Sequence, residues 1–316
     1  MIVTRRSFLA TTGVTLVGAH AAAAAAADAV TVNVGIPPGT MGAIVEYAQE
    51  RGFFKAAGLD ARISIVNSGA AVATALTGGS FDFGAVNVGS LASARLRGLP
   101  LRIIAPAALI PGDRAGGEVV VVRKESAIRN AADLDGKTVA IVSLKTIQHA
   151  AFLAWTDKHG GDPKSLRMFE TPLPTMAALL ESNHVDAAIM VEPYTTQNLI
   201  AGRAVGGSVY DTLPLPLMNY AICATEPWLA ANAATAVKFI GAVRSAAVWG
   251  NAHVSEGRTI LAASMKLEPA VAGAMQLPLM GTTLDGAQIA PLIGLLVRYG
   301  FLEKAVTPSE MIWHPV

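Results

Sequence analysis

The apolar residues of the chain form a repeating pattern of short continuous runs and longer stretches with helical spacing. Residues 30–35 alternate apolar and polar positions and are rich in valine, which predicts a strand. Residues 43–51 place apolar side chains on one helical face and precede Gly52, which predicts a helix that ends there. The pattern continues with predicted strands at 59–66, after Asp82 and at 101–105, and predicted helices at 70–76 and 90–97.

A second set of the same elements begins near Lys137. Asp82 and Asp186 mark the repeat, because each stands between apolar residues at the start of a strand. We expect both carboxylates to accept backbone N–H groups where a helix gives way to a strand, rather than to act as a catalytic pair. The repeat therefore predicts two similar lobes. The strands of the second set are predicted at 137–142, 166–170 and 185–191, and its helices at 148–159 and 175–181.

The order of these elements predicts an α/β fold in which each lobe is a mainly parallel sheet flanked by helices. Extended segments at 118–123 and 219–225 flank the second set, and the chain after Trp228 is predicted to be mostly helical. We interpret the two segments as strands that cross between the lobes and pair with each other as a hinge. An alternative is two sequential domains with a helical C-terminal cap. In the first interpretation, lobe 1 is 28–117 plus 226–316 and lobe 2 is 118–225.

The N-terminus has the pattern of an export leader. Arg5 and Arg6 precede a long uncharged run, rich in alanine and glycine, that extends to Ala27. This pattern predicts a twin-arginine signal peptide over residues 1–27, cleaved at or near Ala27. The alternative is an uncleaved signal anchor, since the run is long enough to span a bilayer. With cleavage, we expect a soluble periplasmic protein whose export requires the twin-arginine translocase.

Composition restricts the remaining chemistry. The 316 residues are 52% hydrophobic and 15% charged, which suits about two domains with large cores. The formal net charge of +1 offers no basic field for nucleic acid. Cys223 is the single cysteine and the histidines are scattered, so we expect neither a disulfide, a metal site nor a cysteine nucleophile. No cofactor is predicted.

Candidate ligand-binding residues follow the predicted strands. In open α/β sheets ligands bind beyond the carboxyl ends of the strands, where helix N-termini present free N–H groups. Such loops in this chain are rich in hydroxyl and amide side chains, and they predict a small-molecule cleft. The candidates are Gly39, Thr40, Met41, Ser68, Gly69, Ala70, Asn87, Ser90, Ser143, Lys145, Thr146, Glu192, Tyr194 and Asn219.

The charges in these loops point to an anionic ligand. Lys145 is their one cation and lies between a strand end and a helix start, where N–H groups already favour negative charge. Glu192 is their one acid, which could face an amine or anchor its own loop. Met41, Met176 and Met218 also fall near these loops and are either core residues or part of the cleft lining.

An ordered set of motifs resembles a known family. The set comprises Glu50–Asp60, Asn67-Ser68-Gly69, Gly79–Gly84, Ala132–Ala140 and Val191–Tyr194, within about residues 30 to 260. It is similar to periplasmic substrate-binding proteins of ABC importers, in the branch related to nitrate, taurine, alkanesulfonate and thiamine-pyrimidine (NMT1/THI5-like) binding proteins. The resemblance implies a two-lobed type II clamp with its site in the cleft between the lobes. The chain lacks the cysteine-rich iron motif of the family's fungal enzymes.

Three functions are therefore considered. The first is an extracytoplasmic solute-binding protein, not an enzyme, that captures a small organic anion and delivers it to an ABC permease driven by its ATPase. The second is an enzyme of pyrimidine or related metabolism on the same fold. The third is a subunit that senses the ligand and presents its closed form to a membrane receptor.

Overall fold

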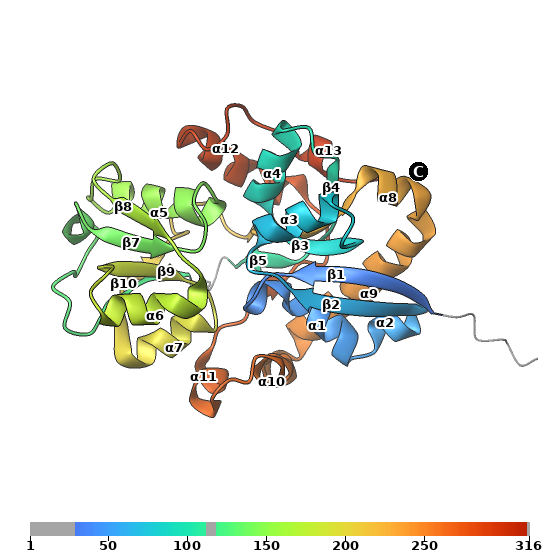
Figure 1. The fold of residues 1–316 in the computed structure, drawn as a ribbon, viewed down its shortest axis with the longest axis horizontal. Helices are drawn as coiled ribbons and strands as arrows, with labels where there is room; N and C mark the ends of the chain where they lie inside the picture. Colours follow the sequence, from blue (N-terminus) through green and yellow to red (C-terminus); the bar gives the residue numbers. More distant parts are fainter. Residues whose placement is uncertain (1–28, 112–117, 315–316) are drawn as a thin grey trace, which may run out of the picture.

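The computed structural model describes residues 29–111 and 118–314, and it consists of two α/β lobes side by side (Figure 1). Each lobe is built on a five-stranded sheet, and a short three-stranded sheet lies where the lobes meet. The predicted signal peptide, residues 1–27, lies outside the described residues. No helix in the described part of the chain is long and apolar enough to cross a membrane.

The first sheet has the order β2-β1-β3-β12-β4. Strand β1 runs parallel to both of its neighbours, β2 and β3, whereas β12 runs antiparallel to both β3 and β4. The strands are β1 (Val30–Ile36), β2 (Leu59–Ile65), β3 (Phe83–Asn87), β4 (Leu101–Pro106) and β12 (Tyr220–Thr225).

The second sheet, of order β10-β6-β9-β7-β8, repeats this plan. Strand β7 runs parallel to β8 and β9, and β6 runs antiparallel to β9 and β10. In both sheets the first strand of a β-α-β-α-β unit therefore lies between the second and the third. The α/β fold class is confirmed. The strands are β6 (Val119–Arg123), β7 (Thr138–Ile141), β8 (Arg167–Glu170), β9 (Ala187–Met190) and β10 (Gly202–Ser208).

Asp82 and Asp186, which mark the repeat, have the structural role predicted for them. The Asp82 carboxylate accepts a 2.7 Å hydrogen bond from the Asn33 amide in β1, and the Asp82 amide donates to the Asn33 carbonyl at 2.9 Å. Asp186 forms the same pair of bonds with Thr138 of β7, both at 2.8 Å. Each aspartate thus ties the chain just before the third strand to the first strand. These bonds lie at the end of the sheet opposite the predicted cleft.

The predicted pairing of the two crossing strands is wrong. Strands β6 and β12 lie in different sheets, each beside the third strand of its lobe. Their residues are almost fully apolar and buried, and a sheet interior gives such strands partners on both sides. The segments that pair at the junction are shorter: β5 (Ala108–Ile110) runs antiparallel to β11 (Leu217–Met218), and β13 (Leu279–Met280) completes their sheet.

Helices cover both faces of the first sheet (Figure 1). Helices α1 (Ala43–Glu50), α2 (Phe53–Ala56) and α9 (Ala233–Ala252) share a core with one face, in which Phe239 stacks on Phe83 with ring centroids 3.9 Å apart. The chain after Trp228 is mostly helical as predicted, apart from β13. The other helices around the first sheet are α3 (Gly69–Thr77), α4 (Val88–Leu96), α8 (Glu226–Ala231), α10 (Val254–Ser264) and α13 (Pro308–Met311).

Helix α12 (Ala290–Arg298) joins the two lobes. It packs on α4 of the first lobe and on α5 (Ile147–Lys158) of the second, so one hydrophobic core runs through both. On the other side of the molecule α11 (Pro269–Ala274) contacts α7 (Tyr194–Ala201), which follows α6 (Leu173–Glu181). Since the C-terminal segment touches both lobes, the assignment of 226–316 to lobe 1 stays a prediction.

The contact between α4, α5 and α12 generates a prediction. Leu296 is fully buried there, and a Cβ added to Gly89 would come within 2.9 Å of its Cδ1 and 3.0 Å of Ile147 Cγ1. We expect Leu296→Ala to lower the free energy of unfolding by about 2–5 kcal/mol, because it removes buried methyl groups and leaves a cavity. Urea denaturation measures this, with Val248→Ala as the control, since Val248 is 56% exposed in α9. Equal effects of the two changes would contradict the bridging role of α12.

Candidate functional site: the cleft between the lobes

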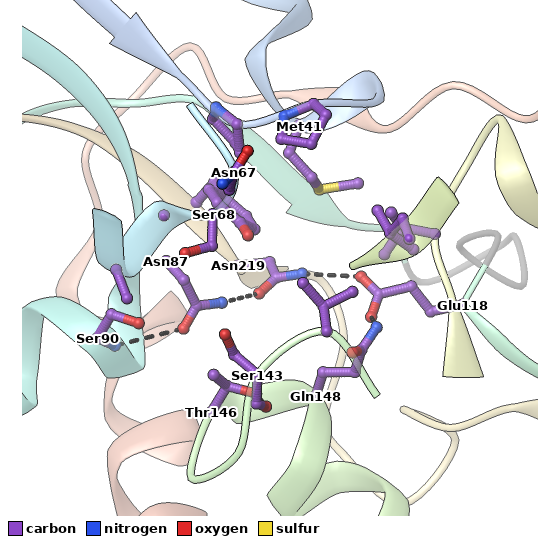
Figure 2. Close-up of a pocket in the computed structure, with 18 residues that line it drawn as sticks. Met41, Asn67, Ser68, Asn87, Ser90, Glu118, Ser143, Thr146, Gln148 and Asn219 are labelled. Atoms are coloured by element: carbon purple, nitrogen blue, oxygen red, sulfur yellow. Dashed lines mark hydrogen bonds between the residues drawn. The ribbon is translucent and has the colours of Figure 1, made fainter. Parts of the chain in front are cut away.

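A pocket lies between the lobes, beyond the carboxyl ends of the parallel strands of both sheets (Figure 2). The pocket is lined by Pro37, Pro38, Met41, Asn67, Ser68, Gly69, Ala70, Asn87, Ser90, Glu118, Val142, Ser143, Thr146, Gln148, Leu173, Val191, Asn219 and Tyr220.

The structure brings most of the predicted site residues together. Those that line the pocket are Met41, Ser68, Gly69, Ala70, Asn87, Ser90, Ser143, Thr146 and Asn219. Gly39, Thr40, Lys145, Glu192 and Tyr194 do not line it. Met176 and Met218 are fully buried core residues. The sequence-based reasoning missed Glu118 and Gln148, which lie outside the strand-end loops.

Two helices present unused backbone donors to this pocket. Ser68 caps α3 by accepting from the Ala71 amide at 3.2 Å, and Thr146 caps α5 by accepting from the His149 amide at 3.4 Å. Within the described residues, the amides of Gly69, Ala70 and Gln148 in the first turns have no hydrogen-bond partner. Such amides, with the positive end of the helix dipole, favour an anionic group.

The third helix at the pocket, α4, uses its N-terminal amides internally. The Asn87 side chain accepts from the amides of Gly89 and Ser90 at 3.0 and 3.4 Å, and the Val88 amide donates to the Asn219 carbonyl at 3.0 Å. The hydroxyls of Ser90 and Ser143 line the pocket from opposite lobes. Neither hydroxyl has a hydrogen-bond partner among the described residues, so both are available to a ligand.

A chain of hydrogen bonds forms the floor of the pocket (Figure 2). Asn87 Nδ2 donates to Asn219 Oδ1 at 2.8 Å, and Asn219 Nδ2 donates to Glu118 Oε1 at 3.0 Å. The other carboxylate oxygen, Oε2, accepts from Gln148 Nε2 at 2.7 Å and from the Tyr210 hydroxyl at 2.8 Å. The chain joins the lobes, because Asn87 ends β3 in the first sheet whereas Glu118 precedes β6 in the second.

Burial dominates the ionisation of Glu118, which is 3% exposed. It raises the pKa of the carboxyl to about 7, against the hydrogen bonds from Tyr210, Gln148 and Asn219, which lower it. Among the described residues that line the pocket there is no lysine, arginine or histidine, so no cation balances this carboxylate.

Lys145 lies outside the pocket lining. Its backbone has a φ of 57°, its side chain is exposed, and its amide donates to the Nδ1 atom of His149 at 3.1 Å. Burial lowers the pKa of His149 to about 4, so this imidazole also carries no positive charge at neutral pH. The expected contact of Lys145 with an anion has no support in this arrangement, and the positive potential of the site comes from backbone amides.

Glu192 anchors its loop across the lobes. Its carboxylate accepts from the Thr196 hydroxyl at 2.8 Å, from the Thr196 amide at 3.1 Å and from the Gln276 amide at 3.1 Å. Its carbonyl accepts from the Thr40 amide at 3.2 Å. Gly39 lies against the same carbonyl with a φ of 88°, and an added Cβ would approach this oxygen to 2.6 Å. These contacts agree with the second role considered for Glu192, that of anchoring its own loop.

Tyr194 lines a separate pocket, together with Gly39 and Lys266. Cys223 is fully buried in β12, where burial raises the pKa of its thiol. In residues 29–111 and 118–314 no group of His, Cys, Asp and Glu side chains is placed to hold a metal ion. The pocket therefore offers hydrogen-bond donors, one carboxyl group and apolar walls.

Comparison with known proteins gives the family. The sequence model described as NMT1/THI5 like matches residues 40–256, more than half of the chain. The chain belongs to the NMT1/THI5-like family. A search of curated proteins found no match. The resemblance drawn from the ordered motifs is thus confirmed.

Solved structures share the fold of this NMT1/THI5-like protein. The alkanesulfonate-binding protein SsuA from Xanthomonas axonopodis pv. citri, bound to MOPS, is 19% identical, with a TM-score of 0.75 over 91% of this chain and 99% of that chain. The periplasmic nitrate-binding protein NrtA from Synechocystis PCC 6803 is 16% identical, with a TM-score of 0.71 over 87% of this chain and 83% of that chain. The desulfurization enzyme DSZB is 16% identical, with a TM-score of 0.66 over 90% and 96%.

The buried carboxyl of Glu118 predicts a specific pH dependence. Its pKa is raised in the folded state, so the folded protein binds this proton more tightly than the unfolded chain. The stability that the proton contributes is complete below the unfolded pKa of about 4.5 and is lost as the pH rises through about 7. Relative to Glu118→Gln, the wild type should lose up to about 3 kcal/mol between pH 4.5 and 7, by roughly 1.4 kcal/mol per pKa unit. Urea denaturation at a series of pH values measures the difference, and parallel profiles for the two proteins would contradict it.

The contacts of Glu192 generate a further prediction. Glu192→Ala leaves the amides of Thr196 and Gln276 without their acceptor, at about 1–3 kcal/mol for the buried amide of Thr196. We expect a lower melting temperature and a larger radius of gyration by X-ray scattering, since the Gln276 bond ties the second lobe to the C-terminal segment. The control is Glu181→Ala, at an exposed helix end. An unchanged radius in Glu192→Ala would show that this bond does not hold the lobes together.

Proposed function

We propose that this protein is the extracytoplasmic solute-binding subunit of an ABC importer. It captures a small organic anion in the cleft between its lobes and delivers it to a permease. The observation that carries the proposal is the pocket itself, in which free amides of α3 and α5 and the hydroxyls of Ser90 and Ser143 converge from both lobes. The sulfonate- and nitrate-binding proteins of the same fold support the choice of an anion.

Binding in this pocket follows from its division between the lobes. The amides of Gly69 and Ala70 belong to the first lobe and that of Gln148 to the second, so a ligand satisfies all three only when the lobes are closed. The donors are fixed in helix termini and need little reordering, which favours affinity. Closure buries the anion among N–H and O–H groups and gives the permease a shape that the empty protein lacks.

Export is part of the same proposal. Cleavage of the twin-arginine leader near Ala27 would release the protein into the periplasm, where the solute is met. The alternative partner is a membrane receptor in place of the permease. Neighbouring genes for an ATPase and a permease would support the importer, and a neighbouring gene for a sensor kinase would support the receptor.

An enzyme on the same fold is the second candidate, and the fold shared with DSZB favours it. The described lining of the pocket contains no cysteine or histidine, and its one carboxyl group is held by amide and phenol donors. Incubation of protein and solute followed by mass spectrometry separates the candidates, because a binding protein returns its ligand unchanged.

The serine hydroxyls provide the test of the binding site. Ser90→Ala and Ser143→Ala should each weaken binding of butane-1-sulfonate by about tenfold to a hundredfold, since hydrogen bonds to charged groups contribute roughly 1.5–3 kcal/mol. Titration calorimetry measures the affinities. Lys145→Met is the matched control and should leave the affinity unchanged, because its side chain lies outside the lining. The opposite pattern, loss in Lys145→Met alone, would mean that the lysine supplies the anion contact.

A further inference from the structure

The binding of an anion alone does not explain why Glu118 lies in the pocket. It is the one acidic residue in the described lining, and it is nearly inaccessible to solvent in a pocket whose other polar side chains are neutral hydroxyls and amides. All the groups that hold it are neutral: Gln148 from α5, with Tyr210 and Asn219 from the segment between β10 and β12. Tyr220 of β12 is also near and neutral. A buried carboxylate without a cation is costly.

The hydrogen bonds to Glu118 leave one acceptor position unused. A carboxylate offers about four lone-pair positions. Two donors, Gln148 and Tyr210, occupy Oε2, but only Asn219 occupies Oε1. Since Glu118 belongs to the pocket lining, a ligand can reach the free position with an N–H group. A cationic donor would also supply the charge that the surrounding protein lacks.

Most of the donors for an anion lie away from Glu118, although Gln148, whose amide is one of them, lies beside it. In Figure 2, Glu118 is on one side and Ser90 on the other, with Asn87 and Asn219 between them and Met41 above them. A ligand that spans the pocket thus meets helix amides and hydroxyls at one end and a carboxylate at the other. The apolar side chains of Met41, Val191 and Leu173 suit a short carbon skeleton.

We propose that Glu118 determines specificity by accepting a hydrogen bond from an amino group of the solute. The natural solute is then a small amphoteric molecule that carries an anionic head and an amino group on a short apolar body. This inference rests on the proposed function, because it assigns the second end of the same ligand.

Matched pairs of probes test the inference. The first pair is 2-aminoethanesulfonate and propane-1-sulfonate, and the second is 3-aminopropane-1-sulfonate and butane-1-sulfonate. Within each pair an ammonium group replaces a methyl group of similar size, and the anionic head is the same. Affinities are measured by calorimetry, with ligand-observed NMR for weak binding at millimolar concentration. The proteins are the wild type, Glu118→Gln and, as control, Glu125→Gln, an exposed acid just beyond β6.

We expect the wild type and Glu125→Gln to bind the amino member of at least one pair tenfold or more tightly than its alkyl partner, and Glu118→Gln to show no preference. In the wild type, affinity for the amino member should rise from pH 6 to pH 8, because a cation binds the ionised carboxylate. Its alkyl partner should show no such rise. Alkyl amines stay protonated over this range. The wild-type comparison decides the case even if Glu118→Gln does not fold.

Equal affinities within both pairs, or a preference that persists in Glu118→Gln, would overturn the inference and leave the proposed function intact. The alkyl sulfonates would then bind through the amides and hydroxyls alone, and Glu118 would be only an anchor between the lobes. If no probe binds to the wild type at millimolar concentration, both the inference and the choice of an anion fail.

Discussion

The buried hydrogen-bond chain from Asn87 through Asn219 to Glu118 is the constraint on which the cleft depends. Its members come from both lobes, and they satisfy each other's polar groups where the chain passes between the lobes. Removing one member leaves its neighbours buried without a partner, at a higher cost than one average hydrogen bond. The floor of the pocket is therefore a fixed point, about which the walls can close.

The repeated topology places the walls around this floor. In each sheet the first strand of the β-α-β-α-β unit lies between the second and the third, and an aspartate ties the third strand to the first at the end opposite the pocket. The loops that follow the parallel strands of both sheets consequently face the same space, with the N-termini of α3 and α5 directed at it. On the two remaining sides of the cleft the lobes are joined by different kinds of contact. Helix α12 joins the lobes through a continuous apolar core, whereas Glu192 joins them through a few hydrogen bonds. Opening on the Glu192 side exposes less apolar surface, and so costs less.

Local pattern predicted the elements and the general position of the site, because both depend on neighbours in the sequence. Alternation and helical spacing located every strand of the two large sheets except β10, and the rule for strand ends selected Ser68, Asn87 and Ser143. The predicted pairing of the crossing strands was wrong, because the partners of a strand depend on the whole sheet and not on the sequence of that strand alone. The two-residue strand β13 is too short to give a periodic signal.

The electrostatics of the site could not be predicted from residue types. Lys145 appeared to be its cation, but a left-handed backbone turn leaves it exposed. Glu118 appeared to be the polar start of a strand, and only the long-range approach of Tyr210 and Asn219 shows that it is a buried pocket residue. The next residue, Val119, pairs with Ser208 across β6 and β10, a contact that no local pattern indicates.

The use of neutral donors in place of a lysine has a physical consequence for release. A fixed cation attracts an anion in the open state as well as in the closed state, whereas helix amides act over the short distance of the first turn. In this cleft the donors are divided between α3 and α5, on opposite lobes. In the proposed function, each lobe alone would bind the anion weakly, and affinity would arise when closure adds the second set of amides and excludes water. Opening of the lobes would separate the two sets of donors, and the solute could leave without a residual charge to hold it.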